Sequence, residues 1–84
     1  MSWYVYMLRC SDGSLYTGCT DDIERRFSCH NSGKGAKYTR SRLPVTLVYQ
    51  EECVDKAAAL RREYAIKQLK KPQKEAIIEK KEQK

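Results

Sequence analysis

The sequence predicts an α+β domain in which a three-stranded antiparallel sheet is flanked by helices, in the order β-β-α-β-α-α. The chain has 84 residues, which is enough for one domain with one modest core. Two aromatic and β-branched runs surround an Asp-Gly step, which is a strong signal for a β-hairpin. Segments of good helix formers follow, separated by glycines and prolines. We expect one domain over residues 1–84, with its core in about 3–78 and a basic C-terminal tail at 79–84.

The first half of the chain predicts a hairpin, a helix and a loop. Residues 3–9 and 14–20 are the two apolar runs of the hairpin. Thr20 and Asp21 can cap a helix that continues through Ile23 to His30, with glycines after it. Residues 31–42 lack apolar periodicity and contain two of the glycines, so we expect a flexible basic loop there.

The second half predicts a strand and two helices. Pro44 precedes an apolar run at 45–50, which is the expected third strand. Asp55 is a suitable N-cap for a helix over 56–71, which must end or kink at Pro72. Pro72 can occupy the first position of a last helix that extends to about Lys81.

The net charge of +6 is concentrated in two basic blocks, and the first points to a polyanionic partner. From Arg25 to Arg42 there are six Arg or Lys residues and no Asp or Glu. This block predicts binding to nucleic acid. The lysines near the C-terminus are interpreted as the solvated face of a helix.

Other classes of protein are not favoured by the sequence. The apolar run at the N-terminus is too short to span a bilayer and has no secretory cleavage site, so we expect a soluble cytoplasmic protein without a membrane partner. None of the four cysteines forms a C-x-x-C pair, which favours reduced, packed thiols over a disulfide or zinc framework.

Four short motifs, in this order, carry a resemblance to a known family. They are Tyr4-Val5-Tyr6, then Leu15-Tyr16-Thr17-Gly18, then Arg26 with His30, and finally Glu63 within the segment 61–67. Each is weak alone, but their joint order and spacing over residues 3–78 resemble the GIY-YIG nuclease superfamily. The similarity is to its small standalone bacterial members, long known as uncharacterised protein family 0213.

The resemblance implies a site in which Tyr6 and Tyr16 lie in a cleft, Arg26 stabilises a phosphate and Glu63 holds one divalent ion, Mg²⁺ or Mn²⁺. Residue chemistry agrees with these roles. Mg²⁺ takes oxygen ligands and keeps several waters, so one carboxylate and a phosphate oxygen suffice. The planar guanidinium of arginine suits the charge that develops on a phosphate. The general base stays open among Tyr6, Tyr16 and His30, since a phenol near pKa ~10 would need nearby cations to ionise.

A shared tyrosine site requires one particular hairpin register, because a shift of one residue sends side chains to the other face. A two-residue turn would place Tyr16 opposite Arg9 and separate it from Tyr6. A three-residue loop, 11–13, with Gly13 in the left-handed region, pairs Leu8 with Tyr16 and places both tyrosines on one face. We predict the three-residue loop.

Each candidate also has a structural interpretation. The tyrosines can simply pack in a sheet, His30 can interact with the last carbonyls of its helix, and Glu63 can pair with Lys67 at i,i+4 spacing. The chain also departs from the family pattern, because its first motif lacks the glycine and its only asparagine is Asn31, whereas larger members carry one near the end of the domain.

The sequence favours a metal-dependent endonuclease that hydrolyses phosphodiester bonds of DNA, possible roles being structure-selective steps of repair or recombination. The alternative is a non-catalytic module that retains the fold and binds DNA or RNA. DNA is the expected partner ahead of RNA, the expected state is a monomer, and no small-molecule cofactor is expected. The residues expected to contact nucleic acid are Arg25, Lys34, Lys37, Tyr38, Arg40 and Arg42.

Overall fold

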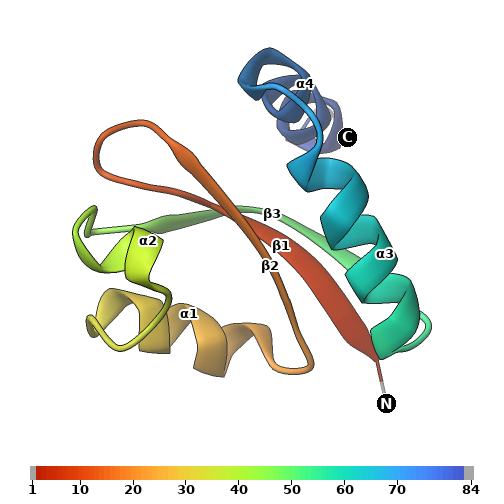
Figure 1. Cartoon of the computed structure of the whole chain (residues 1–84), viewed down its shortest axis with the longest axis horizontal. Coiled ribbons are helices and arrows are strands. Elements are labelled where there is room, and N and C mark those ends of the chain that lie inside the picture. The colour runs from red at the N-terminus through yellow and green to blue at the C-terminus, as the bar shows by residue number, and fades with distance from the viewer. Residues whose placement is uncertain (1, 83–84) are drawn as a thin grey trace.

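The computed structural model describes residues 2–82, and it is a sheet with two helices on each side (Figure 1). The strands are β1 (Trp3–Arg9), β2 (Leu15–Thr20) and β3 (Thr46–Cys53). The helices are α1 (Ile23–Asn31), α2 (Lys37–Arg40), α3 (Lys56–Lys67) and α4 (Lys71–Glu82). In Figure 1, α1 and α2 cover one face of the sheet, whereas α3 and α4 lie on the other. The predicted class, an antiparallel three-stranded sheet with flanking helices, is therefore confirmed.

Several local predictions need correction. The segment expected to be a flexible loop contains the short helix α2. Asp22, and not Thr20 or Asp21, is the N-cap of α1, because its side chain accepts a hydrogen bond from the Arg25 amide. The third strand continues to Cys53, three residues beyond the predicted end, and α3 stops at Lys67, before the proline.

The hairpin has the predicted three-residue loop. Leu8 pairs with Tyr16, and the Cys10 amide donates to the Ser14 carbonyl at 2.9 Å. Gly13 has φ of 85°, a left-handed conformation that a residue with a side chain adopts only with strain. The sheet order is β2-β1-β3, so β1 is central and β2 is at an edge. This register places Tyr6 and Tyr16 on the same face, as predicted.

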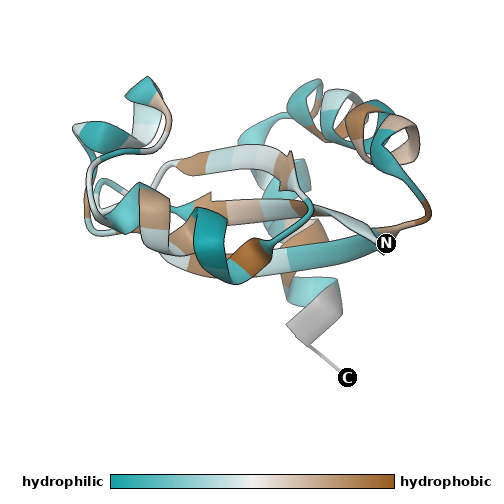
Figure 2. Cartoon of the chain, turned by 90° about the horizontal axis from the view of Figure 1, so that it is seen from below, coloured by the Kyte–Doolittle hydropathy of each residue, from teal (hydrophilic) through white to brown (hydrophobic). Residues whose placement is uncertain are grey.

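The buried apolar residues form two clusters, one on each face of the sheet, instead of the single core expected from the chain length. Val5 and Met7 pack against α3 and α4 through Ala59, Ile66 and Ile78. On the other face, Tyr6, Leu8 and Cys10 form a second cluster with Val45, against which residues of α1 pack. Figure 2 shows apolar residues along the strands and in α1, whereas α2 is mostly hydrophilic. The face under α1 and α2 therefore combines a buried floor with a polar rim.

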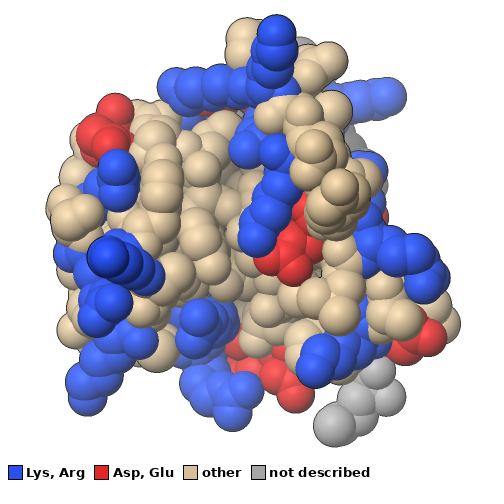
Figure 3. Space-filling view, in the orientation of Figure 1, with Lys and Arg blue, Asp and Glu red and all other residues tan. Residues whose placement is uncertain are grey.

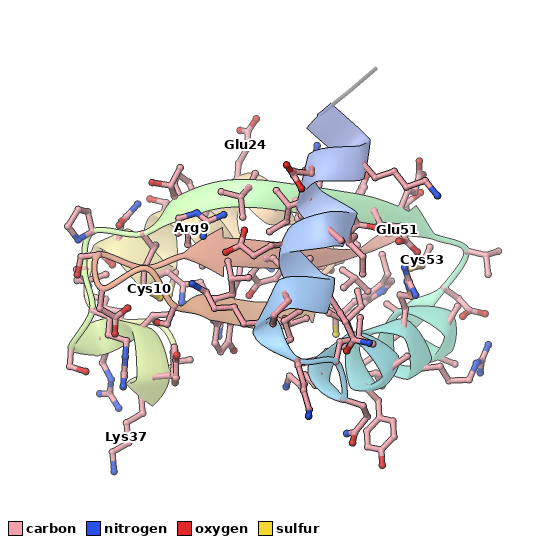
Figure 4. The ribbon with its side chains drawn as sticks, turned by 90° about the horizontal axis from the view of Figure 1, so that it is seen from above. Arg9, Cys10, Glu24, Lys37, Glu51 and Cys53 are labelled. Atoms are coloured by element: carbon pink, nitrogen blue, oxygen red, sulfur yellow. The ribbon has the colours of Figure 1, made fainter. Side chains whose placement is uncertain are left out.

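The last helix is fastened to the central strand by a two-point ion pair. The two terminal guanidinium nitrogens of Arg9 each lie 2.7 Å from one carboxylate oxygen of Glu75. Figure 4 shows Arg9 beside α4, which crosses over the sheet at this point. A bidentate arginine–carboxylate pair fixes orientation as well as distance, so α4 is held in place on the face opposite the tyrosines.

Candidate active site

The residues on the α1 face form a cluster of aromatic rings. The Tyr16 ring centroid lies 6.4 Å from that of Tyr6 and 5.2 Å from that of His30. The Tyr38 ring, from α2, lies 6.1 Å from Tyr16. Tyr6 is 2% exposed and His30 is fully buried, whereas Tyr16 is only half-buried. Tyr16 is therefore the catalytic candidate of this group that lies nearest to solvent.

A chain of hydrogen bonds leads from Tyr6 into the protein. The Tyr6 hydroxyl lies 3.0 Å from His30 Nε2, and His30 Nδ1 lies 2.8 Å from Thr39 Oγ1. Thr39 donates its own hydroxyl proton to the Ala36 carbonyl at 3.0 Å. Because a hydroxyl has only one proton, Thr39 must accept from His30 Nδ1–H. His30 Nε2 is then unprotonated and accepts the Tyr6 proton.

The electrostatics favour neutral forms of both groups. Burial raises the pKa of Tyr6 to about 12, although the neighbouring Arg26 guanidinium opposes this change. Burial, and then repulsion by Arg26, lowers the pKa of His30 below its usual value. At neutral pH the pair is therefore a phenol that donates to a neutral imidazole.

Two glycines allow this arrangement because a side chain would collide with it. A Cβ on Gly18 would lie 2.7 Å from the Tyr6 hydroxyl oxygen, and a Cβ on Gly35 would lie 2.3 Å from His30 Nδ1. Gly18 belongs to the second motif of the sequence, so its presence there has a steric reason. Gly35 leaves space for the imidazole between α1 and α2.

Glu63 lies on the other face of β2. Its Oε1 accepts a hydrogen bond from the Cys19 thiol at 3.3 Å, and its Oε2 lies 2.8 Å from the Lys67 ammonium. Burial, followed by the bond to Glu63, raises the pKa of Cys19 to about 11, so Cys19 stays a thiol that donates. Within residues 2–82, no hydrogen bond or ion pair links Glu63 to Tyr6, Tyr16, Arg26 or His30.

The charge of Lys67 interacts with residues on both faces of the sheet. Its pKa is raised, first by the bond to Glu63, and interactions with Tyr16 and Cys19 add to the shift. Tyr16 faces α1 and Cys19 faces α3, so the charge of Lys67 acts on residues from both faces of β2. In Figure 1, β2 passes in front of the other strands, with α1 and α2 on one side and α3 on the other. The candidate residues therefore approach each other around the edge strand and not across one face.

The chain matches the model of the GIY-YIG catalytic domain over residues 2–76. It belongs to the GIY-YIG family. A UPF0213 protein of Halobacterium salinarum is 57% identical over 89% of this chain and 97% of its own length. A UPF0213 protein of Desulfotalea psychrophila is 55% identical over 92% and 71%, respectively. The solution structure of a UPF0213 protein from Bacillus halodurans has 49% sequence identity and a TM-score of 0.61, covering 94% of this chain and 84% of that one.

This GIY-YIG chain is thus a member of a nuclease superfamily whose enzymes act on nucleic acid. The names of its UPF0213 relatives carry no activity and no metal. None of the helices in residues 2–82 is both long and apolar enough to cross a membrane.

The donor chemistry fits one divalent ion at Glu63. Among the described residues, no three His, Cys, Asp or Glu side chains gather as a metal-binding group, so Glu63 would be the single protein carboxylate on a bound ion. A cation already lies at this carboxylate, namely the Lys67 ammonium, whose side chain is 48% exposed. A lysine this exposed can swing away, and a hard cation could take its place with water and phosphate oxygens as further ligands.

Some basic residues between Arg25 and Arg42 form ion pairs within the described part of the chain, and others do not. Lys34, Lys37 and Arg40 are exposed and make no ion pair in the part of the chain that is described. Figure 4 shows Lys37 pointing away from α2 into solvent. Arg25 pairs with Asp21 at 3.3 Å.

Arg42 makes contacts within the protein that stabilise the fold. It forms an ion pair with Asp12 of the hairpin loop at 3.1 Å and lies 4.0 Å above the Tyr38 ring. Its role toward nucleic acid, like that of Tyr38, stays a prediction.

Sequence reasoning missed two residues of this site. Thr39 fixes the tautomer of His30, and Cys19 orients Glu63. The i,i+4 spacing of Glu63 and Lys67 did indicate their pairing. Thr39 lay inside the segment interpreted as a loop, where no periodicity indicated that it would be buried. Asn31 binds both backbone groups of Val45, so it closes the loop between α1 and β3.

Proposed function

We propose that this chain is a metal-dependent endonuclease that hydrolyses phosphodiester bonds of DNA. The observation that carries the proposal is the hydrogen-bonded series Tyr6, His30 and Thr39 beside the Arg26 guanidinium. A buried imidazole held in one tautomer against a phenol is a proton acceptor with a fixed direction. A domain that only binds nucleic acid has no need for such an arrangement.

In the proposed reaction, Tyr6 is the general base toward the attacking water. Because its pKa is about 12, almost no phenolate exists at neutral pH. Tyr6 can still take a proton from water if it passes its own proton to His30 Nε2 in the same step. Tyr16 has no such acceptor within residues 2–82, and its half-buried ring is assigned to positioning the substrate.

Arg26 is assigned to the charge that develops on the phosphate. Its pKa is raised, first by its interaction with Tyr6, so it stays a cation beside the base. A guanidinium can donate two parallel hydrogen bonds to phosphate oxygens, which a lysine cannot do. The same cation disfavours protonated His30, so the imidazole returns its proton readily after each cycle.

Glu63 would hold a single Mg²⁺ or Mn²⁺, with Cys19 fixing the orientation of the carboxylate. When bound, such an ion polarises a phosphate oxygen and stabilises the charge on the leaving group. Lys67 must leave Glu63 before this site can be used. Its ammonium is then free to contact the substrate backbone.

Electrostatic complementarity supports nucleic acid as the substrate. Figure 3 shows basic side chains over α1 and α2 on one side of the face, and over α3 on the other, with mostly uncharged surface between them. Lys34, Lys37 and Arg40 are assigned to phosphate contacts, and we propose DNA as the substrate and a monomer as the working form. Replacing these three residues by Gln should lower the salt dependence of DNA binding without altering Mn²⁺ binding. An unchanged salt dependence would argue against the contact.

The deciding experiment is cleavage of plasmid, single-stranded and branched DNA with Mg²⁺ or Mn²⁺. Wild-type protein is compared with Tyr6→Phe, Arg26→Ala and Glu63→Gln. Glu79→Gln is the matched control, because Glu79 is an exposed carboxylate on α4. We expect the first three variants to lose cleavage and the control to retain it. Binding without cleavage by the wild-type protein would instead indicate a non-catalytic nucleic-acid-binding module.

A further inference from the structure

Two large apolar side chains on α3 project into solvent beside the candidate metal carboxylate. Leu60 is 46% exposed and Tyr64 is 68% exposed. They are four residues apart on the helix, so they lie one above the other on the same side. The inward side of α3 is formed by Ala59 and Ile66, both fully buried. The fold therefore does not use Leu60 and Tyr64 as core residues.

A shallow hollow joins these two side chains to the candidate site. Its volume is about 230 Å³, and it is lined by Leu60 and Tyr64 together with Glu63 and Lys67. An exposed aromatic ring is thus adjacent to the carboxylate assigned to the metal and to the lysine that pairs with it. Any group that fills the hollow touches both an apolar wall and a charged one.

We propose that Leu60 and Tyr64 form a subsite for one unpaired nucleobase of a DNA strand, next to the phosphate that is cut. This inference rests on the proposed function. The aromatic ring of tyrosine supplies a stacking surface for a base of any sequence, and the leucine supplies an apolar edge. Lys67, whose side chain is 48% exposed, is placed to contact the phosphate that accompanies the base. The substrate class is therefore DNA with an unpaired nucleotide, such as a single-stranded tail or a junction.

A nucleobase fits this surface better than a protein partner does. A stable protein interface buries roughly 800 Å² on each side, far more than two side chains present. The surrounding charge also suits a polyanion, since the chain carries +6 overall. A duplex keeps its bases stacked inside the helix, so only an unpaired base can reach the ring. The subsite thus discriminates by strand structure and not by sequence.

The test measures binding in EDTA, so that DNA stays intact whatever the cleavage activity. A duplex with a single-stranded tail, carrying fluorescent 2-aminopurine at the first unpaired position, is compared with the fully paired duplex. We expect stacking on Tyr64 to quench the fluorescence of the tail and to favour the tailed DNA. Tyr64→Ala should remove the quenching and reduce that preference roughly 5- to 150-fold, the range expected for loss of one stacked base. Tyr64→Trp should restore both.

Val54→Ala is the control, because Val54 is 83% exposed but lies before α3 and outside the hollow. An unchanged preference in Tyr64→Ala, or an equal loss for both DNAs, overturns the subsite. A difference in oligomeric state between the wild-type protein and Tyr64→Ala, measured by sedimentation, also overturns the subsite, because the surface would then be an interface between copies of the chain. Cleavage is scored separately. A Tyr64-dependent preference without any cleavage keeps the subsite and refutes the nuclease proposal alone.

Discussion

Replacing Thr39 by Val tests whether a single buried hydroxyl sets the protonation state of the site. Valine has nearly the shape of threonine but neither accepts nor donates a hydrogen bond. Thr39 and His30 are both fully buried, so no water replaces the lost partner of His30 Nδ1. The substitution also removes the bond to the Ala36 carbonyl.

The expected magnitude follows from this burial. A buried donor left without a partner costs about 1–3 kcal/mol of folding free energy. For a domain of this length, each kcal/mol lowers Tm by about 4–8 °C. The Nδ1–H tautomer also loses about 1 kcal/mol of stabilisation, so about a fivefold smaller share of molecules can accept the Tyr6 proton. We therefore expect a lower Tm and about a fivefold or greater fall in kcat, with KM for DNA unchanged.

Nitrogen-15 NMR of the imidazole reads the tautomer directly, because His30 is the only histidine in the chain. Thr39→Ser is the matched control, since it keeps the hydroxyl and removes only a methyl group. We expect the serine variant to retain the Nδ1–H tautomer and most of the activity. If Thr39→Val keeps that tautomer and full activity at a temperature where it is folded, the relay through His30 is wrong.

Four further predictions follow from the same geometry. Gly18→Ala would place a Cβ 2.7 Å from the Tyr6 hydroxyl oxygen, so we expect about 1–3 kcal/mol of destabilisation in urea titrations and a larger loss of cleavage than of DNA binding. The pKa of His30 is lowered and that of Tyr6 is about 12, so kcat/KM should fall only below pH ~6.5 and stay level up to about pH 10. If the logarithm of kcat/KM instead rises with a slope of one between about pH 8 and 10, the base is a phenolate. The lowered pKa of His30 also means that stability is fully present above pH ~6.5 and declines as the pH falls below it, which urea titrations at several pH values can check. Lys67→Met removes the cation at Glu63, so Mn²⁺ should bind more tightly in the absence of DNA, as measured by electron paramagnetic resonance, and weaker binding would show that Lys67 supports the site instead of competing for it.

The hairpin shows how far a sequence can fix geometry. An Asp-Gly step between two apolar runs limits the loop to a few types, and only one of them places Tyr6 and Tyr16 on the same face. The register with Leu8 opposite Tyr16 followed from that choice and is confirmed. Local chemistry was sufficient because the hairpin residues are close in sequence. The N-cap at Asp55 was predicted for the same reason.

Features that depend on distant segments were not predictable in this way. Thr39 is buried because α2 packs against α1, yet its own segment has the composition of an exposed basic loop. Likewise, nothing in the local sequence of α3 says that Glu63 meets Cys19 of β2, 44 residues away. Arg42 was interpreted from its charge alone, whereas its ion pair with Asp12 spans 30 residues. In each case the decisive contact is tertiary, and its two partners carry no common local signal.

The position of Glu63 constrains how a substrate can approach. Tyr6, the proposed base, and Arg26 belong to the face under α1, whereas Glu63 belongs to the face under α3, and β2 separates them. If all three act on one phosphodiester, the DNA backbone must pass along the edge of β2. That edge is open, because β2 pairs only with β1 in the described sheet. An edge strand exposes unpaired backbone N–H groups, which can donate to phosphate oxygens. The sheet edge that most proteins must protect would thus be the surface on which the proposed nuclease holds its substrate.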